Sequence, residues 1–303
     1  MPFGDGREYD RAMVASPEPD ETKGFAPALA EPGLARRSRP ELLVEWIFRP
    51  LAGLVVAALL PLRVSPVAVV LANALAGLAA AIAIVAGQLV AAALLLQLKT
   101  VLDNADGQLA RASGRTTALG RYLDTELDLV VNLAVFAALA HETSSPFLAL
   151  AAFLALTVVL SADFNEDVLY RRARGESVVT EPSTTGEGAL ARTLARIYGL
   201  VFAPQDRALQ SVSRKRLERL LAGVEQAEQR ERATLAYHDG VTSAILANLG
   251  LSTQLAMLGV CLVLEAPVVY LWLVLGFAAL LPLLQVRREL VARRVVWGLV
   301  GEG

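Results

Sequence analysis

The stretch LDNADGQLARASGRTTALGRYLDTELD, residues 102–128, decides how the chain is interpreted. Residues spaced i, i+3, i+4, i+7 and i+8 share one helix face, which in the first half groups Asp103, Asp106, Gly107, Ala110 and Arg111. The same reasoning groups, in the second half, Thr117, Gly120, Asp124 and Asp128. Because the connecting turn ASGRT is short, we expect two antiparallel neighbouring helices whose four aspartates converge.

The composition places these helices in a membrane. Of the 303 residues, 55% are hydrophobic and only 19% are charged, and the mean hydropathy is +0.49. Apolar runs of about 20 residues, the length that crosses a bilayer, recur along the chain. The chain is therefore predicted to be an all-α polytopic membrane protein with six transmembrane helices, at about 66–86, 89–111, 117–140, 146–168, 241–264 and 267–286.

The distribution of arginine predicts the orientation of these helices. The turns at 87–88, 141–145 and 265–266 contain no Lys or Arg. The opposite side carries Arg36, Arg37, Arg63, Arg115, Arg171, Arg172, Arg174, Arg287, Arg288, Arg293 and Arg294. We therefore expect a multi-pass protein of the cell (plasma) membrane, with both termini and the acidic turn on the cytoplasmic side.

The first predicted span is preceded by ELLVEWIFRPLAGLVVAALLP, residues 41–61. Arg49-Pro50 interrupts this run, and the apolar remainder is too short to cross a bilayer. We expect an interfacial amphipathic helix with Trp46 and Arg49 at headgroup depth; a tilted extra span is the alternative. Residues 1–40 show no signal-peptide pattern and are predicted to be a disordered cytoplasmic N-terminus.

A polar insert, residues 175–239, separates the fourth and fifth spans. After a Ser/Thr/Gly-rich loop it is predicted to form helices at about 189–202 and 207–236, packed on the protein or on anionic lipid. The predicted organisation is thus a cytoplasmic N-terminus (1–40), the interfacial helix with four spans (41–174), a cytoplasmic helical insert (175–239), and two spans with a C-terminal tail (240–303).

Four carboxylates at the mouths of apolar helices would repel one another unless cations compensate their charge. Divalent ions with oxygen ligands suit this arrangement, and Mg²⁺ commonly binds carboxylates together with substrate phosphates. A pair of ions can clamp both the attacked phosphate and the leaving oxygen. Gly107 and Gly120 leave room for a phosphorylated ligand, and Arg111 is placed to bind phosphate oxygens.

The spacing of these residues resembles the signature of the CDP-alcohol phosphotransferase family, D-x2-D-G-x2-A-R-x8-G-x3-D-x3-D, at every fixed position. The resemblance implies an enzyme in which an acceptor hydroxyl attacks the phosphate linked to an alcohol and CMP leaves. It implies Mg²⁺ (or Mn²⁺), as two ions, bound by Asp103, Asp106 and Asp124. Asp128 would be the general base and a neighbour of the metal. The implied CDP-binding residues are Gly107, Ala110, Arg111, Thr117 and Gly120.

The resemblance extends to LYRRARGE at the end of the fourth span. It implies that Arg172 and Arg174 hold a phosphate of the acceptor; the alternative is that they are cytoplasmic anchors of the helix. The implied donor is CDP-diacylglycerol, the implied acceptor glycerol phosphate or inositol phosphate, and the implied assembly a homodimer in the bilayer. The net charge of −2 gives no indication of a nucleic-acid partner.

Two departures and three alternatives accompany this interpretation. The family's Pro-Asn and Thr near the first span are replaced here by Pro66-Val67 and Val70, and the insert is longer than is typical. Lys99, one turn before Asp103, is expected to form a structural ion pair with it.

Three other functions are alternatives to a transferase: a carboxylate-lined ion transporter or channel, a non-catalytic scaffold, and a histidine-based hydrolase. Only two histidines exist, and His238 is expected at the surface.

Overall fold

The computed structural model describes residues 40–176, 188–189, 192–193, 196 and 203–300. The elements in this part are helices: η1 (Val44–Phe48), α2 (Arg49–Leu59), α3 (Pro66–Val85), α4 (Leu89–Ala112), α5 (Ala118–Glu142), α6 (Pro146–Ala173), α8 (Ala203–Leu220), α9 (Ala227–Tyr237), α10 (Gly240–Ala247), α11 (Leu251–Val263) and α12 (Pro267–Val300). The predicted disordered segment and most of the predicted helix 189–202 lie outside the described residues.

Four helical stretches of the described chain are long and apolar enough to cross a membrane: Pro66–Val85, Pro146–Ala173, Ala227–Val263 and Pro267–Gly298. Helices α4 and α5 form where the sequence predicts spans, but their ends carry the charged residues of the acidic motif, so neither belongs to this set. The protein is thus all-helical and multi-pass over its described part, while the count of six spans stays a prediction.

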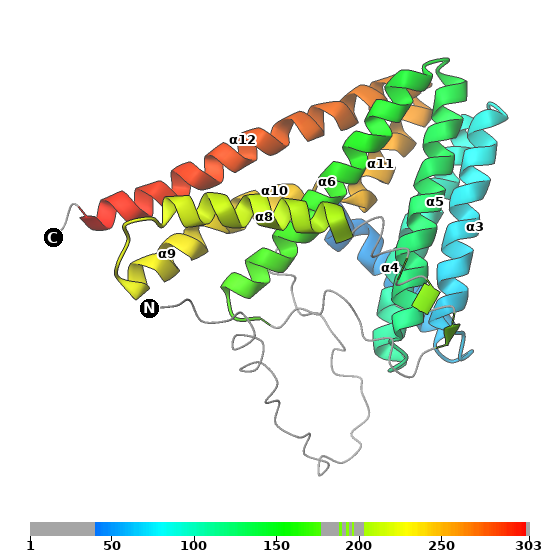
Figure 1. Ribbon diagram of the computed structural model, residues 1–303. Helices are drawn as coiled ribbons and strands as arrows, with labels where there is room; N and C mark the ends of the chain where they lie inside the picture. The colour runs from blue at the N-terminus through cyan, green and yellow to red at the C-terminus, as the bar shows by residue number, and fades with distance from the viewer. Residues whose placement is uncertain (1–39, 177–187, 190–191, 194–195, 197–202, 301–303) are drawn as a thin grey trace, which may run out of the picture. The chain divides into compact units, whose positions relative to one another are not determined.

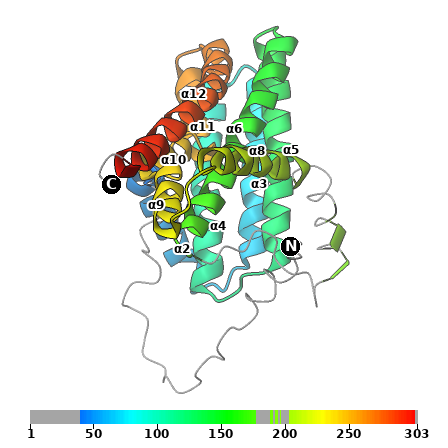
Figure 2. The same ribbon diagram turned by 60° about the vertical axis from the view of Figure 1, so that its left-hand side comes forward.

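The acidic hairpin has the predicted helices, joined by a short turn. Gly114, at a φ of +65°, reverses the chain after α4, and Thr117 caps α5 by accepting a hydrogen bond from the backbone amide of Gly120. Both helices pack closely on α3 (Figures 1 and 2), and Lys99 of α4 forms an ion pair with Asp128 of α5. The spacing of the motif alone does not reveal that α3 packs on both helices.

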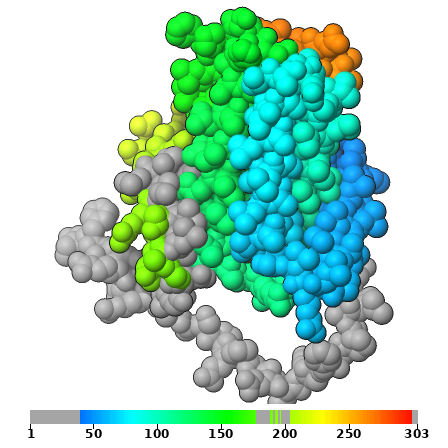
Figure 3. All heavy atoms as spheres, turned by 90° about the vertical axis from the view of Figure 1, so that its right-hand side faces the viewer, coloured from blue at the N-terminus to red at the C-terminus, as the bar shows by residue number. Residues whose placement is uncertain are grey.

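Small residues on α3 explain this close packing. A Cβ atom at Gly77 would lie 2.3 Å from Val131 Cγ1 on α5 and 3.2 Å from Lys99 Cδ on α4. The main apolar core extends from this contact into α6, α11 and α12, and its fully buried members include Leu96, Val131, Leu139, Leu156, Leu258, Leu262 and Tyr270. Figure 3 shows the outer face of α3, in cyan, at the surface beside the blue residues of α2.

The segment before α3 is helical across Arg49-Pro50, as expected for the predicted helix at 41–61. Pro50 lies in the first turn of α2, directly after a wider π-helical turn in which the Arg49 amide donates to the Val44 carbonyl. Helix α2 packs on α4 through a second apolar cluster that includes Ala52 and Ala105. Trp46 remains 78% exposed. Placement of this helix in the membrane interface stays a prediction.

Two other predicted helices are each broken into two. The predicted helix 207–236 is interrupted between α8 and α9, where Gly223 adopts a φ of +88°, a conformation that glycine accommodates readily. The predicted span 241–264 is interrupted between α10 and α11. There the Asn248 side chain accepts a hydrogen bond from the Leu42 amide and donates one to the Pro40 carbonyl, which ties the break to the start of the described chain.

His238 is buried, and its predicted surface position is wrong. Its Nδ1 lies 2.8 Å from Arg288 Nη2 on α12 and 3.4 Å from Glu166 Oε1 on α6. Arg288 also forms a 2.8 Å ion pair with Glu166. The sequence places α12's arginines at a membrane boundary but cannot reveal that α12 continues past the predicted span end and meets α6 and α9.

Candidate metal centre

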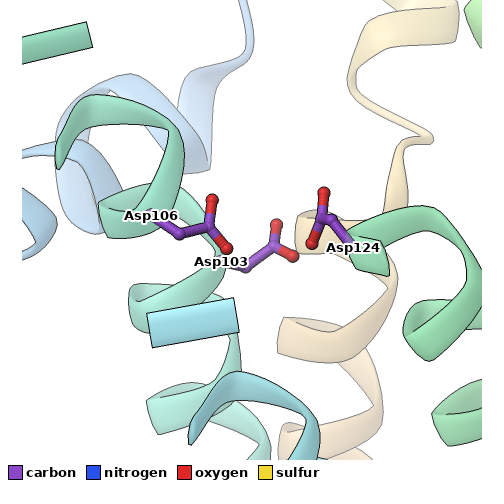
Figure 4. A group of neighbouring side chains, drawn as sticks. All are labelled: Asp103, Asp106 and Asp124. Atoms are coloured by element: carbon purple, nitrogen blue, oxygen red, sulfur yellow. The ribbon is translucent and has the colours of Figure 1, made fainter. Parts of the chain in front are cut away.

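Three of the four predicted aspartates converge at the ends of α4 and α5 that face each other. Asp103 and Asp106 project from α4 and Asp124 from α5, and one carboxylate oxygen of each lies within 4.8 Å of the others (Figure 4). Asp103 lies between the other two in this view. Such crowding of negative charge is unfavourable without a compensating cation.

Two of these carboxylates have buried oxygens that lack a hydrogen-bond partner among the described residues. They are Oδ2 of Asp106 and Oδ1 of Asp124. A buried carboxylate oxygen without a donor is costly, whereas the same oxygen is a suitable ligand for a hard divalent cation. The donor set therefore fits Mg²⁺ or Mn²⁺, and it leaves further ligand positions for phosphate oxygens or water.

Asn73 of α3 supports this centre and was missed by the sequence analysis. Its Nδ2 donates a 3.1 Å hydrogen bond to Asp103 Oδ1, and the side chain is buried. An amide that holds a metal-binding carboxylate fixes the orientation of that carboxylate. The available signal was a lone polar residue within the apolar run PVAVVLANALAGLAAAIAIV.

Asp128 differs from the three clustered aspartates because it forms a close ion pair with a lysine. Lys99 Nζ lies 2.7 Å from Asp128 Oδ1 and 3.9 Å from Asp103 Oδ1, and the lysine side chain is fully buried. The predicted ion pair with Asp103 is therefore the longer of two contacts. Lys99 joins α4 to α5 and gives Asp128 a partner that the other aspartates do not share at this distance.

The predicted CDP-binding residues surround the same end of the hairpin. A Cβ atom at Gly107 would lie 3.4 Å from Arg111 Nη1, so the exposed guanidinium covers this glycine. A Cβ atom at Gly120 would lie 3.2 Å from the Thr117 hydroxyl oxygen. Ala110 lies on α4 within one turn of both Gly107 and Arg111. The motif thus forms a local cluster, and its binding of CDP stays a prediction.

A cavity of about 240 Å³ opens beside Asp124 and Asp128. It lies between α5 and α6, and α8 and α11 contribute to its wall. Its polar lining consists of Asp124, Thr125, Asp128, Asn132, Thr157, Ser161 and Asp206. The remaining lining is apolar: Leu129, Phe153, Leu156, Leu160, Phe164 and Leu251. The cavity is large enough for a small polyol next to the predicted base.

The two predicted acceptor arginines do not line this cavity. Arg174 donates from both terminal nitrogens to the His238 carbonyl, at 3.1 Å each, and its guanidinium lies 3.4 Å from the centre of the Tyr170 ring. These contacts give Arg174 a structural role at the start of α10. Arg172 is exposed. Their binding of an acceptor phosphate stays a prediction.

In the described part of the chain, the fold and the centre define a helical membrane protein with an acidic, metal-compatible site. The CDP-alcohol phosphatidyltransferase family model matches residues 63–201, which contain the whole acidic motif, so the resemblance seen in the sequence is confirmed. Members of this family are divalent-metal-dependent transferases that use CDP-alcohol donors and alcohol acceptors. These matches give no support to the ion-channel alternative.

Two curated archaeal relatives have been found. The chain is 46% identical over 66 residues to a bifunctional IPC transferase and DIPP synthase of Thermococcus kodakarensis. This matched segment is 22% of this chain and 15% of that protein. It is 36% identical over 103 residues to an archaetidylinositol phosphate synthase of Aeropyrum pernix, covering 34% of this chain and 47% of that protein. The matches thus span less than half of each relative. No solved structure shows a significant match.

Proposed function

We propose that the chain is an integral-membrane CDP-alcohol phosphotransferase. It transfers a phosphatidyl-type phosphoalcohol from a CDP-alcohol to an acceptor alcohol and releases CMP, as a step of phospholipid or polar-lipid synthesis. The observation that carries the proposal is the convergence of the Asp103, Asp106 and Asp124 carboxylates within a segment that matches the family. The fourth aspartate of the motif, Asp128, is paired with the Lys99 ammonium.

The metal would be held by Asp103, Asp106 and Asp124, the three residues whose oxygens converge. Mg²⁺ or Mn²⁺, as a pair of ions, would neutralise charge on the diphosphate and on the departing CMP. Asn73 keeps Asp103 oriented through its hydrogen bond. Asp106 and Asp124 supply buried oxygens that have no competing donor among the described residues.

Asp128 acts as the general base on the acceptor hydroxyl. The acceptor oxygen forms a bond to the phosphorus that carries the donor alcohol, and the bond from that phosphorus to the CMP oxygen breaks. The hydroxyl proton passes to the Asp128 carboxylate. The Lys99 ammonium holds one oxygen of this carboxylate at 2.7 Å, which leaves the other available to the acceptor.

The nucleotide would be bound by Gly107, Ala110, Arg111, Thr117 and Gly120, with Arg111 as a fork for phosphate oxygens. CDP-diacylglycerol is the proposed donor. The name of the Aeropyrum pernix relative supports inositol phosphate as acceptor over glycerol phosphate. We further propose a cytoplasm-facing site, cytoplasmic termini and a homodimer.

Purified protein in detergent tests this proposal directly. It is given CDP-diacylglycerol and Mg²⁺ or Mn²⁺ with inositol phosphate, glycerol phosphate, inositol or serine, and CMP release is measured. The proposal predicts metal-dependent CMP release that requires one of these acceptors. Absence of CMP release with every acceptor and either metal would contradict the transferase assignment.

A further inference from the structure

The insert contributes an acidic side chain to the cavity beside the proposed base. Asp206 lies in the first turn of α8, which crosses α6 in both ribbon views (Figures 1 and 2). It lines the same cavity as Asp124 and Asp128, and only 8% of the residue is exposed. A carboxylate from the insert therefore reaches a cavity whose other acidic residues belong to the catalytic motif.

Hydrogen bonds between α6 and α8 fix the position of Asp206. Asn165 Nδ2 donates to Asp206 Oδ1 at 2.8 Å and to the Ser161 carbonyl at 2.8 Å. Gln210 Nε2 in turn donates to Asn165 Oδ1 at 2.7 Å, and Asn165 is only 3% exposed. The neighbouring Gln205 donates to the Thr157 carbonyl at 3.2 Å. The carboxylate is thus oriented in advance of any ligand.

The polar residues that line the cavity favour hydroxyl groups over phosphate. Its described lining contains three carboxylates and no Lys or Arg. Carboxylates accept hydrogen bonds from hydroxyls, whereas they repel a phosphate in the same space. An acceptor that presents one hydroxyl to Asp128 would place its other hydroxyls toward Asp206, and a phosphate on that acceptor would lie outside the cavity.

We propose that Asp206 determines acceptor specificity by accepting hydrogen bonds from the non-reacting hydroxyls of a polyol bound beside Asp128. This inference rests on the proposed transferase function. It gives the insert a role in the site, since the insert brings Asp206 to the cavity. The competing explanation is that Asp206 only joins α8 to α6 through Asn165.

The test compares Asp206→Ala and Asp206→Asn with the wild type. Glu218→Ala is the matched control, because Glu218 is an exposed acid on the same helix. CMP release is followed with CDP-diacylglycerol while inositol phosphate, or inositol phosphates that each lack one hydroxyl, are varied. A hydrogen bond to a charged group corresponds to about a 10- to 100-fold change in affinity. Asp206→Ala should raise the KM for inositol phosphate by about this factor, with kcat and the donor KM little changed.

At least one deoxy acceptor should have the same KM with the wild type and with Asp206→Ala, because the lost hydrogen bond is absent in both cases. An unchanged KM for inositol phosphate in Asp206→Ala, with CMP release intact, would overturn this inference and leave the transferase function standing. Equal loss with all acceptors and the donor, together with a lower unfolding temperature, would assign Asp206 a structural role only. Lack of CMP release by the wild type with inositol phosphate, glycerol phosphate, inositol and serine, and with either metal, would overturn both proposals.

Discussion

Replacement of Lys99 by methionine removes the buried ammonium group beside Asp103 and Asp128 while it keeps a side chain of similar length. The Lys99 side chain is fully buried and pairs with Asp128 at 2.7 Å and with Asp103 at 3.9 Å. Loss of one partner from a buried ion pair costs about 3–5 kcal/mol, because the other charge stays buried and unpaired. Since the Asp128 side chain is 21% exposed, we expect the lower end, about 3 kcal/mol of the free energy of unfolding.

The free energy of unfolding is measured by denaturant titration in mixed micelles with EDTA present. The double variant Lys99→Met, Asp128→Asn should regain most of the loss, because the neutral amide needs no cation. Lys215→Met is the control, since Lys215 is an exposed lysine on α8. When Mg²⁺ replaces EDTA in the titration, it should stabilise Lys99→Met more than the wild type, because the metal supplies the positive charge that the variant has lost. A single variant within about 0.5 kcal/mol of the wild type, or a double variant no more stable than the single, would refute the reasoning.

The remaining predictions concern the packing and the metal. Gly77→Ala should lower the free energy of unfolding by about 1–3 kcal/mol, because the new Cβ would lie 2.3 Å from Val131 Cγ1. Denaturant titrations should show that adding Val131→Ala restores part of this free energy. Asn73→Ala should raise the Mg²⁺ concentration for half-maximal CMP release by about 10- to 100-fold, because Asp103 loses the hydrogen bond that orients it. EDTA should abolish CMP release, and excess Mg²⁺ or Mn²⁺, but not Na⁺, should restore it; activity that persists in EDTA would contradict a metal-dependent site.

The acidic hairpin could be predicted from the sequence because its information is local. Helical spacing puts Asp103 and Asp106 on one face and Asp124 on the face of the next helix, and Gly114 and Thr117 provide the turn and the cap. These features depend on residues within a few turns of one another. The convergence of three aspartates follows from them and agrees with the structure.

The parts that the sequence missed depend on contacts between distant segments. Asn73 meets Asp103 across 30 residues, and Asp206 meets Asn165 across 41. No spacing rule connects such pairs, because their proximity follows from how α3, α6 and α8 pack. Lys99 shows the same limit, since its neighbour in sequence, Asp103, is the more distant partner and Asp128 the closer one.

The helix breaks were missed for a related reason. Hydrophobic periodicity continues through Asn248, whose side chain instead bonds to the backbone at Pro40 and Leu42. Gly223 gave a weak signal for the break between α8 and α9, since an isolated glycine inside a helical pattern is tolerated. His238 gave none, because its partners come from α6 and α12.

The most direct test of the account is CMP release by the wild type, Asp106→Ala and Asp128→Asn with CDP-diacylglycerol, inositol phosphate and Mg²⁺. The account predicts acceptor-dependent CMP release by the wild type and its loss in both variants, since Asp106 would hold the metal and Asp128 would take the acceptor proton. Full metal-dependent activity of Asp106→Ala would contradict the metal assignment. Full acceptor-dependent activity of Asp128→Asn would contradict its role as the base.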